Sequence, residues 1–142
     1  MYQRILVPVD GSGHALRAVQ SAQWLASQGA ANGTRITLLH VSPVLAFNDA
    51  ALGVDNLDDR QEEEGHRVLQ EAEQTLQGTG IPFETEYMTG PPAKTICAKA
   101  REGQYDLIVM GSRGLNLLSE ILVGSVSHYV VQHAHCPVLI VK

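Results

Sequence analysis

The sequence predicts an α/β fold: a five-stranded parallel sheet with helices on both faces, in a Rossmann-like arrangement. Short apolar runs alternate along the chain with longer segments whose apolar residues recur at helical spacing. The run Leu107 to Met110 is apolar throughout, which is typical of a strand buried on both faces. Strands that alternate with helices are joined by right-handed crossovers into a parallel sheet. The 142 residues contain no repeat or linker, so we expect a single domain over residues 1–142.

The first half of the chain predicts two strands and two helices. Pro8 lacks a ladder donor, so we place it at the carboxyl end of the first strand. Ser12 or Gly13 is positioned to cap the helix that follows, in which apolar residues line one face. The charged stretch after Leu57 carries apolar residues at helical spacing and predicts an amphipathic surface helix. In order, we expect strand 4–10, helix 14–31, strand 35–41, an irregular loop or short helix over 42–57, and helix 58–77.

The second half predicts three strands and two helices. Residues 83–88 alternate so that one face can meet solvent, which favours a strand at the edge of the sheet. The turn Gly90-Pro91-Pro92 precedes the next helix, and proline in a first helical turn is favourable. In order, we expect strand 83–88, a helix with Ala93, Ile96, Cys97 and Ala100 on one face, strand 107–110, helix 125–134, and strand 137–142.

Composition excludes several classes of function. The formal net charge is −5, which argues against nonspecific binding to nucleic acid or to an anionic membrane surface. No apolar run approaches the roughly 18 residues that cross a bilayer, and no signal peptide is visible, so a cytoplasmic location is expected. Cys97 and Cys136 lie in separate elements without Cys-x-x-Cys spacing, and we expect them to be buried free thiols.

A glycine pattern between residues 106 and 127 is the strongest indication of a site. Gly111-Ser112-Arg113-Gly114 follows the buried strand, nine residues intervene, and Gly124-Ser125-Val126-Ser127 opens a helix. Glycine allows a positive φ and close approach of a ligand to the backbone at Gly111 and Gly114. The free amides of a helix start favour an anion. The alternative interpretation is that these glycines serve only tight turns and a helix start.

This pattern resembles the ATP-binding signature of the universal stress proteins, and the resemblance extends over the whole chain. It implies strand order 3-2-1-4-5, bound ATP with Mg or Mn bridging the phosphates, and a homodimer joined by the last strand, Pro137 to Lys142. It also implies that Asp10 meets the ribose and that the backbone of Val41 meets adenine. The nucleotide-binding residues are then expected to be Pro8, Val9, Asp10, Val41, Met110, Gly111, Ser112, Arg113, Gly114, Gly124, Ser125, Val126 and Ser127.

Two of these roles have alternatives that the sequence leaves open. Asp10 could instead bond to amides of its own loop, as Asp-Gly turns often do. Arg113 could contact phosphate or be a solvated loop residue. Otherwise the phosphate donors are expected to be the amides of Ser112 to Gly114 and of Gly124 to Val126, together with the hydroxyls of Ser125 and Ser127.

Other site types fit the sequence poorly. No glycine stands directly before Lys94, so there is no Walker loop. The segment Gly124 to His128 lacks the last glycine of a nucleophile elbow. His133-Ala134-His135-Cys136 is too short to place three ligands around one metal ion. Because no catalytic base is evident, fast ATP turnover is not expected. Three hypotheses remain: a nucleotide-binding regulator, a dimeric adaptor without nucleotide, and a slow ATPase or phosphotransferase.

Overall fold

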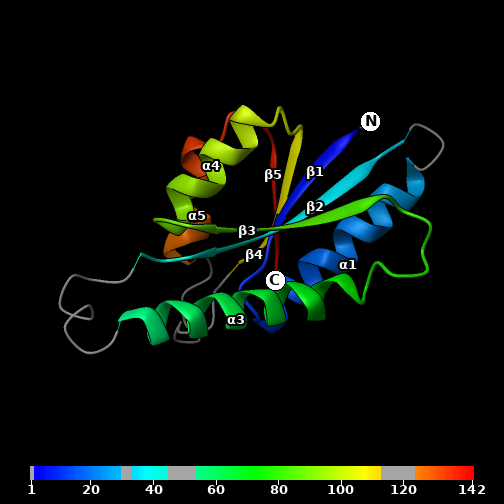
Figure 1. The fold of residues 1–142 in the computed structure, drawn as a ribbon. Coiled ribbons are helices and arrows are strands. Elements are labelled where there is room, and N and C mark those ends of the chain that lie inside the picture. Colours follow the sequence, from blue (N-terminus) through cyan, green and yellow to red (C-terminus); the bar gives the residue numbers. More distant parts are fainter. Residues whose placement is uncertain (1, 30–32, 45–53, 113–123) are drawn as a thin grey trace.

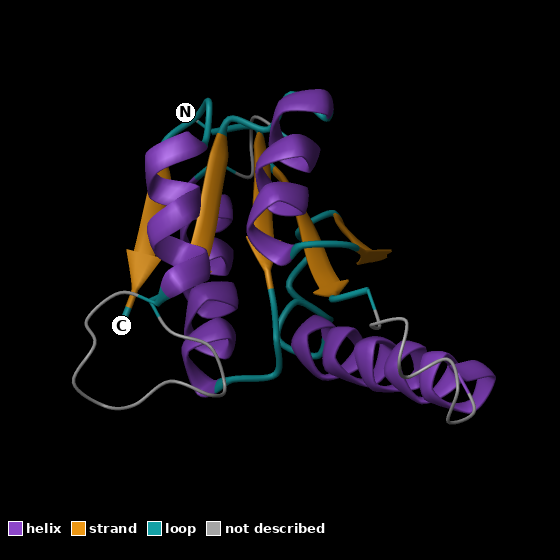
Figure 2. Ribbon diagram, turned by 90° about the vertical axis from the view of Figure 1, so that its left-hand side faces the viewer, coloured by secondary structure: helices purple, strands orange, loops and turns teal. Residues whose placement is uncertain are grey.

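The computed structural model describes residues 2–29, 33–44, 54–112 and 124–142 of the chain. Its five strands form one parallel sheet in the order β3-β2-β1-β4-β5, as predicted. Figure 2 shows the strands side by side and running in the same direction. The strands are β1 (Arg4–Pro8), β2 (Arg35–Ser42), β3 (Phe83–Thr89), β4 (Leu107–Gly111) and β5 (Val138–Val141).

Helices cover both faces of this sheet. One face carries α1 (Gly13–Gln28) and α3 (Val54–Glu73), and the other carries α4 (Pro92–Glu102) and α5 (Ser125–His133) (Figure 1). Each face therefore has its own apolar core. The first core joins α1 and α3 to the sheet and includes Ile5, Val7, Val19, Ala22, Leu38, Leu69, Leu76 and Val109. The second joins α4 and α5 to the sheet and includes Leu6, Leu39, Ile96, Ala100, Tyr105, Ile108, Met110 and Val130.

The boundaries of three elements differ clearly from the prediction, and the first of them is α1, which ends at Gln28 with Gly29 as its C-cap rather than at residue 31. β1 ends at Pro8 rather than at Asp10, and beyond it the Val9 amide still bonds to β2, at the Leu39 carbonyl. α3 spans residues 54–73 rather than 58–77. Leu76, which we expected inside the helix, is nevertheless buried, because a turn in which its amide bonds to the carbonyl of Glu73 brings it back to the core.

The remaining elements agree closely with the prediction. Ser12 is the N-cap of α1, and its hydroxyl accepts a hydrogen bond from the Ala15 amide at 3.1 Å. β3 lies at one edge of the sheet, where Glu86 pairs with Lys99 of α4 at 2.5 Å. Cys97 and Cys136 are free, as predicted, but they are half-buried rather than buried, and this partial burial raises the pKa of each thiol.

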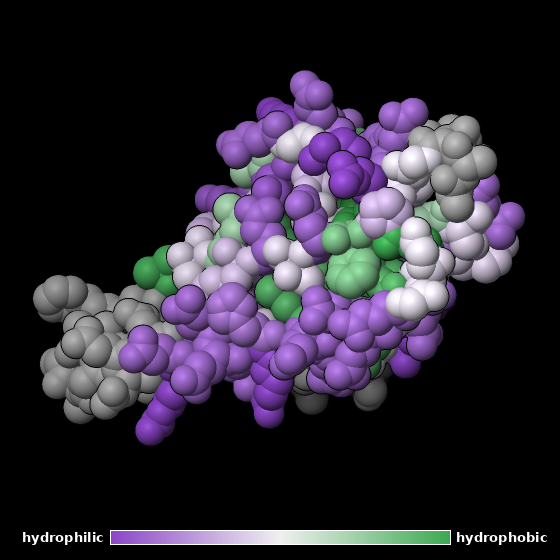
Figure 3. Space-filling view, turned by 45° about the vertical axis from the view of Figure 1, so that its right-hand side comes forward, coloured by the Kyte–Doolittle hydropathy of each residue, from purple (hydrophilic) through white to green (hydrophobic). Residues whose placement is uncertain are grey.

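The face drawn in Figure 3 is mostly polar. On the face in Figure 3, apolar side chains show only in small areas between hydrophilic ones. Within the described ranges, no helix has the length and apolar content that crossing a membrane requires.

Candidate nucleotide site

The carboxyl ends of β1, β2 and β4 meet at one end of the sheet, where the winding reverses. From β1 the chain adds β2 and β3 on one side, and it then returns to place β4 and β5 on the other. Ligands of open α/β sheets bind beyond the strand ends at such a switch point. Asp10 follows β1, Val41 lies near the end of β2, and Ser112 follows β4, so three predicted site segments converge here.

Asp10 has one carboxylate oxygen engaged within its own turn. Its Oδ1 accepts a hydrogen bond from the Ser12 amide at 2.9 Å, across Gly11, which has a φ of +89°. The loop-bonding alternative for Asp10 is therefore confirmed. It does not exclude a ligand, because a carboxylate accepts several bonds and Oδ2 has no partner among the described residues.

Neither Pro8 nor Val9 has a free backbone N–H group to donate to a ligand. The Val9 amide donates to the Leu39 carbonyl at 2.8 Å, and the Val9 carbonyl lies 2.8 Å from Nδ1 of His40. Pro8 has no N–H group, and Val9 is only 4% exposed. If these two residues meet a nucleotide, they do so mainly through van der Waals contact.

Val41 presents an unpaired backbone donor and acceptor at the crevice. In a parallel strand the N–H and C=O of one residue point to one neighbour and those of the next residue to the other. Leu39 bonds toward β1, through Val9, and Ser42 bonds away from it, through Gly90. The N–H and C=O of Val41 therefore point toward the β1 side, where the last paired residue is Pro8. No described residue bonds to either group.

Met110 and Gly111 have packing roles at the end of β4. The Met110 side chain is buried in the second core. A Cβ on Gly111 would lie 2.7 Å from Cβ and 2.8 Å from the carbonyl carbon of His14, so glycine is needed for the close approach of α1. Gly111 does not use the positive φ that glycine allows, because its φ is not in the left-handed region. Arg113 and Gly114 lie outside the described residues.

Ser112 joins three elements, and its amide is not free to donate to a phosphate. Its amide donates to the Val141 carbonyl of β5 at 2.8 Å, and its Oγ lies 3.2 Å from Nδ1 of His14 on α1. Its carbonyl accepts from the Gly124 amide at 2.6 Å and from the Ser127 hydroxyl at 2.9 Å. We expected the Ser112 amide, the Gly124 amide and the Ser127 hydroxyl to be phosphate donors. The structure uses the first to join the end of β4 to β5, and the other two to attach the start of α5 to the end of β4.

The start of α5 nevertheless offers several donors to an anion. Gly124 is the N-cap and has no side chain, and the first turn contains no acidic residue. The amides of Ser125, Val126 and Ser127 have no partner in the described part of the chain, and Ser125 is exposed. Unpaired amides and the helix dipole together favour negative charge at this point.

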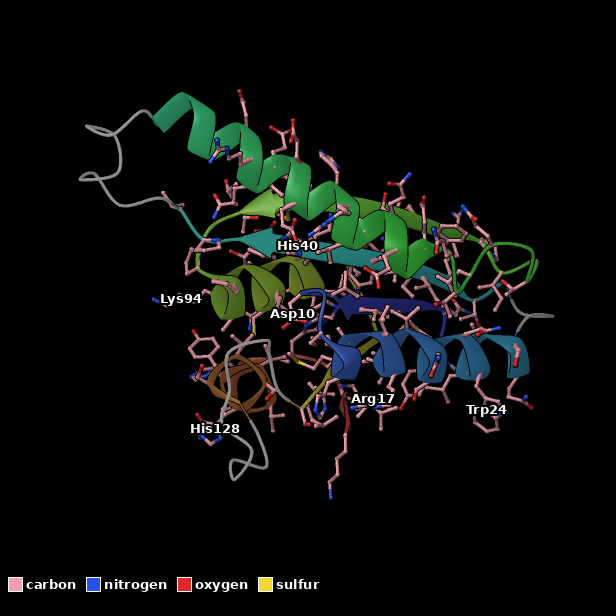
Figure 4. All side chains as sticks on the ribbon, turned by 90° about the horizontal axis from the view of Figure 1, so that it is seen from below. Asp10, Arg17, Trp24, His40, Lys94 and His128 are labelled. Carbon is pink, nitrogen blue, oxygen red and sulfur yellow. The ribbon has the colours of Figure 1, made fainter. Side chains whose placement is uncertain are left out.

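Sequence reasoning missed two residues, His14 and His40. Figure 4 shows His40 on β2 and Asp10 at the turn before α1. His40 lies two residues after Leu38 and shares its face of β2. A polar residue on this otherwise apolar face was the available signal. His14 had no such signal, because its bond to Ser112 joins residues far apart in the sequence.

The metal alternative at the end of α5 gains no support from the described geometry. The Nδ1 of His133 lies 2.9 Å from the Tyr129 carbonyl of its own helix. Within the described ranges, no three His, Cys, Asp or Glu side chains gather as a metal site would need.

Known proteins resemble this chain over its whole length. The model of the universal stress protein family matches residues 1–142. Universal stress protein YxiE of Bacillus subtilis is 34% identical, with 100% of both chains covered. The solved structure of universal stress protein UspA from Lactobacillus plantarum has a TM-score of 0.87 at 29% identity, covering 99% of this chain and 98% of that one.

Two other similar solved structures contain a nucleotide. One is a universal stress protein in complex with cAMP, 28% identical with a TM-score of 0.74, covering 99% of this chain and 97% of that one. The other is a universal stress protein family member from Arabidopsis thaliana with AMP bound, 26% identical with a TM-score of 0.69, covering 99% of this chain and 91% of that one. By sequence along its whole length and by strand order, the chain belongs to the universal stress protein family.

Proposed function

We propose that this protein is a stress-response regulator that binds ATP in the crevice between the ends of β1, β2 and β4. The open start of α5 is the observation that carries the proposal, because its unpaired amides lie beside the end of β4 with no acidic residue in the turn. The relatives with AMP and cAMP bound support a nucleotide as the ligand.

The described residues suit the three parts of ATP in order across the sheet. Adenine carries an amino donor beside a ring nitrogen acceptor, which the C=O and N–H of Val41 would complement. The free oxygen of Asp10 would accept from a ribose hydroxyl. The amides of Ser125, Val126 and Ser127 and the Ser125 hydroxyl would hold phosphate oxygens. Arg113 and Gly114 remain predicted phosphate contacts.

Mg or Mn would accompany the phosphates rather than occupy a protein cage. Asp10 is the carboxylate that we expect at the crevice, and no described cluster offers three ligands. Such an ion would be held by phosphate oxygens and water, which is how Mg²⁺ usually binds nucleotides. The ion would neutralise phosphate charge that the described residues do not pair.

Isothermal titration with ATP tests the site. Gly124→Asp should abolish binding, because it places a carboxylate against the phosphates, and Gly114→Leu should do so by steric clash. Asp10→Ala should weaken binding by about 1 to 3 kcal/mol, the range for hydrogen bonds to charged groups. Gln132→Glu adds the same charge to an exposed position farther along α5 and should leave affinity unchanged. Unchanged affinity in both glycine variants would remove the site assignment.

We also propose that ATP acts by stabilising the protein rather than by being consumed. A ligand at 1,000 times its Kd adds about 4 kcal/mol to stability, so the melting temperature should rise with ATP. Phosphate release with metal present should stay well below about one per second, an ordinary enzyme rate. Faster release would favour the ATPase alternative. A dimer that binds no ATP would favour the adaptor.

A single domain and a cytoplasmic location belong to the same proposal. The family model matches residues 1–142 without a break, which supports one domain. Cys97 and Cys136 are both free, as is usual in a reducing compartment. Fractionation of cells that express the tagged protein would test the location.

A further inference from the structure

The His40 ring holds the segment that leads from β1 into Asp10. Its Nδ1 lies 2.8 Å from the Val9 carbonyl, and a carbonyl only accepts hydrogen bonds, so Nδ1 carries the proton. The Val9 amide donates to Leu39 at 2.8 Å. Two successive residues of β2 therefore satisfy both polar groups of Val9, although β1 itself has already ended at Pro8.

The far side of the His40 ring is packed against β3 and α3. The Tyr87 ring of β3 stacks near it, with centroids 6.0 Å apart and planes 21° apart. A Cβ on Gly65 of α3 would lie 2.3 Å from Cε2 of Tyr87 and 2.9 Å from Cδ2 of His40. Figure 4 shows His40 on β2 with α3 beside it. On this side the ring is confined by Tyr87 and by the backbone of α3 at Gly65.

We propose that His40 is a positioning residue for the Asp10 carboxylate, and that it couples the packing of α3 to nucleotide affinity. The inference rests on the ATP site proposed above. Without the imidazole donor, the buried carbonyl of Val9 loses its partner, and the turn from Val9 to Ser12 keeps only one of its two attachments to β2, the bond from the Val9 amide to the Leu39 carbonyl. Asp10 is then no longer held in a fixed relation to the free backbone groups of Val41 on the same strand as His40.

Two substitutions at His40 separate the hydrogen bond from the bulk of the ring. His40→Leu removes the donor and should lower ATP affinity about tenfold, in keeping with the loss of one buried hydrogen bond. His40→Asn keeps an N–H donor near the position of Nδ1 and should restore most of that affinity. In an Asp10→Ala background, His40→Leu should add little further loss, because its effect acts through the carboxylate.

A third substitution tests the contact with α3. Gly65→Ala should push on the rings of Tyr87 and His40 and lower ATP affinity several-fold, although Gly65 is on neither glycine loop. Glu63→Ala changes an exposed residue of the same helix and should leave affinity at the wild-type value. Circular dichroism of every variant confirms that the fold is retained.

Two measurements on the unliganded protein do not depend on nucleotide binding. Ring ¹⁵N shifts of wild-type His40 should report protonated Nδ1, and amide exchange at Ser12, whose N–H bonds to Asp10, should accelerate in His40→Leu. Wild-type-like affinity and Ser12 exchange in the folded Leu variant would overturn the inference, as would a protonated Nε2 with bare Nδ1. If wild type binds no ATP, the proposed function fails and the coupling to affinity fails with it. The tautomer and the exchange rate then still decide whether His40 holds the Asp10 turn.

Discussion

At the scale of single residues, the polar atoms at the end of β4 serve packing before they serve a ligand. Ser112 is 1% exposed and its amide, carbonyl and hydroxyl are all engaged by other elements. Gly111 next to it is required by the backbone of α1. The contacts of Ser112 and Gly111 are thus already formed before a ligand binds. This part of the site therefore needs little reorganisation on binding.

Gly111→Ala should destabilise the protein by about 1 to 3 kcal/mol, the usual cost of overpacking. The added methyl group meets the backbone of His14, which cannot rotate aside as a side chain can. For a chain of this size, thermal denaturation should show a melting temperature lower by about 2 to 4 °C per kcal/mol.

Gly13→Ala is the matched control, because Gly13 begins α1, the helix that Gly111 contacts. Its Cβ would meet only the Arg17 guanidinium, at 3.5 Å, an ordinary contact. Alanine is also the better helix former, so stability should be unchanged or slightly raised. Equal destabilisation by the two substitutions would show that Gly111 has no special packing role.

At the scale of elements, periodicity predicted the type of each strand and helix that the structure describes and their succession along the chain, because each buries one or two faces of regular spacing. The end of β1 could also be argued from Pro8 alone. The ends of α3 were harder to predict. Leu76 continues the apolar spacing of that helix, yet it reaches the core from a turn, and periodicity does not distinguish a last helical turn from the turns that follow it.

The same limit applies to the candidate site. The glycine and serine pattern located the loops correctly at the strand ends, since the sheet order brings them together. It could not assign individual donors, because the partners of Ser112 lie on α1, α5 and β5 and the pairing depends on tertiary contact. The free backbone of Val41 follows from the different lengths of β1 and β2, which a strand pattern alone leaves uncertain by a residue or two.

At the scale of the whole molecule, the two edges of the sheet differ in how they meet solvent. β3 carries Glu84 and Glu86, and charge at an edge opposes pairing with another chain. β5 is apolar from Val138 to Val141, and Leu139 is 40% exposed. Val131 of α5 is 51% exposed as well. This contrast supports the proposal that β5 pairs with its copy in a homodimer, as the family resemblance implies.

The direction of the backbone groups on β5 allows a sharp test of that dimer. The carbonyls of Pro137 and Val141 accept bonds from the β4 side, so residues 137, 139 and 141 point toward β4. The amides of Val138 and Ile140 therefore point to the open edge. Ile140→Pro should remove a donor from the dimer ladder while leaving the pairing with β4 intact, because proline is tolerated where the N–H side of an edge strand faces solvent.

Leu139→Pro is the complementary substitution, since the Leu139 amide points toward β4 and its loss should disturb the fold itself. Sedimentation should then show wild type as a dimer at micromolar concentration and Ile140→Pro as a monomer with an unchanged circular dichroism spectrum. Leu139→Pro should lose ordered structure as well as association. Wild type that sediments as a monomer throughout that range would rule the dimer out. A dimer retained by Ile140→Pro would place the interface elsewhere, with the exposed Val131 on α5 as the next surface to test.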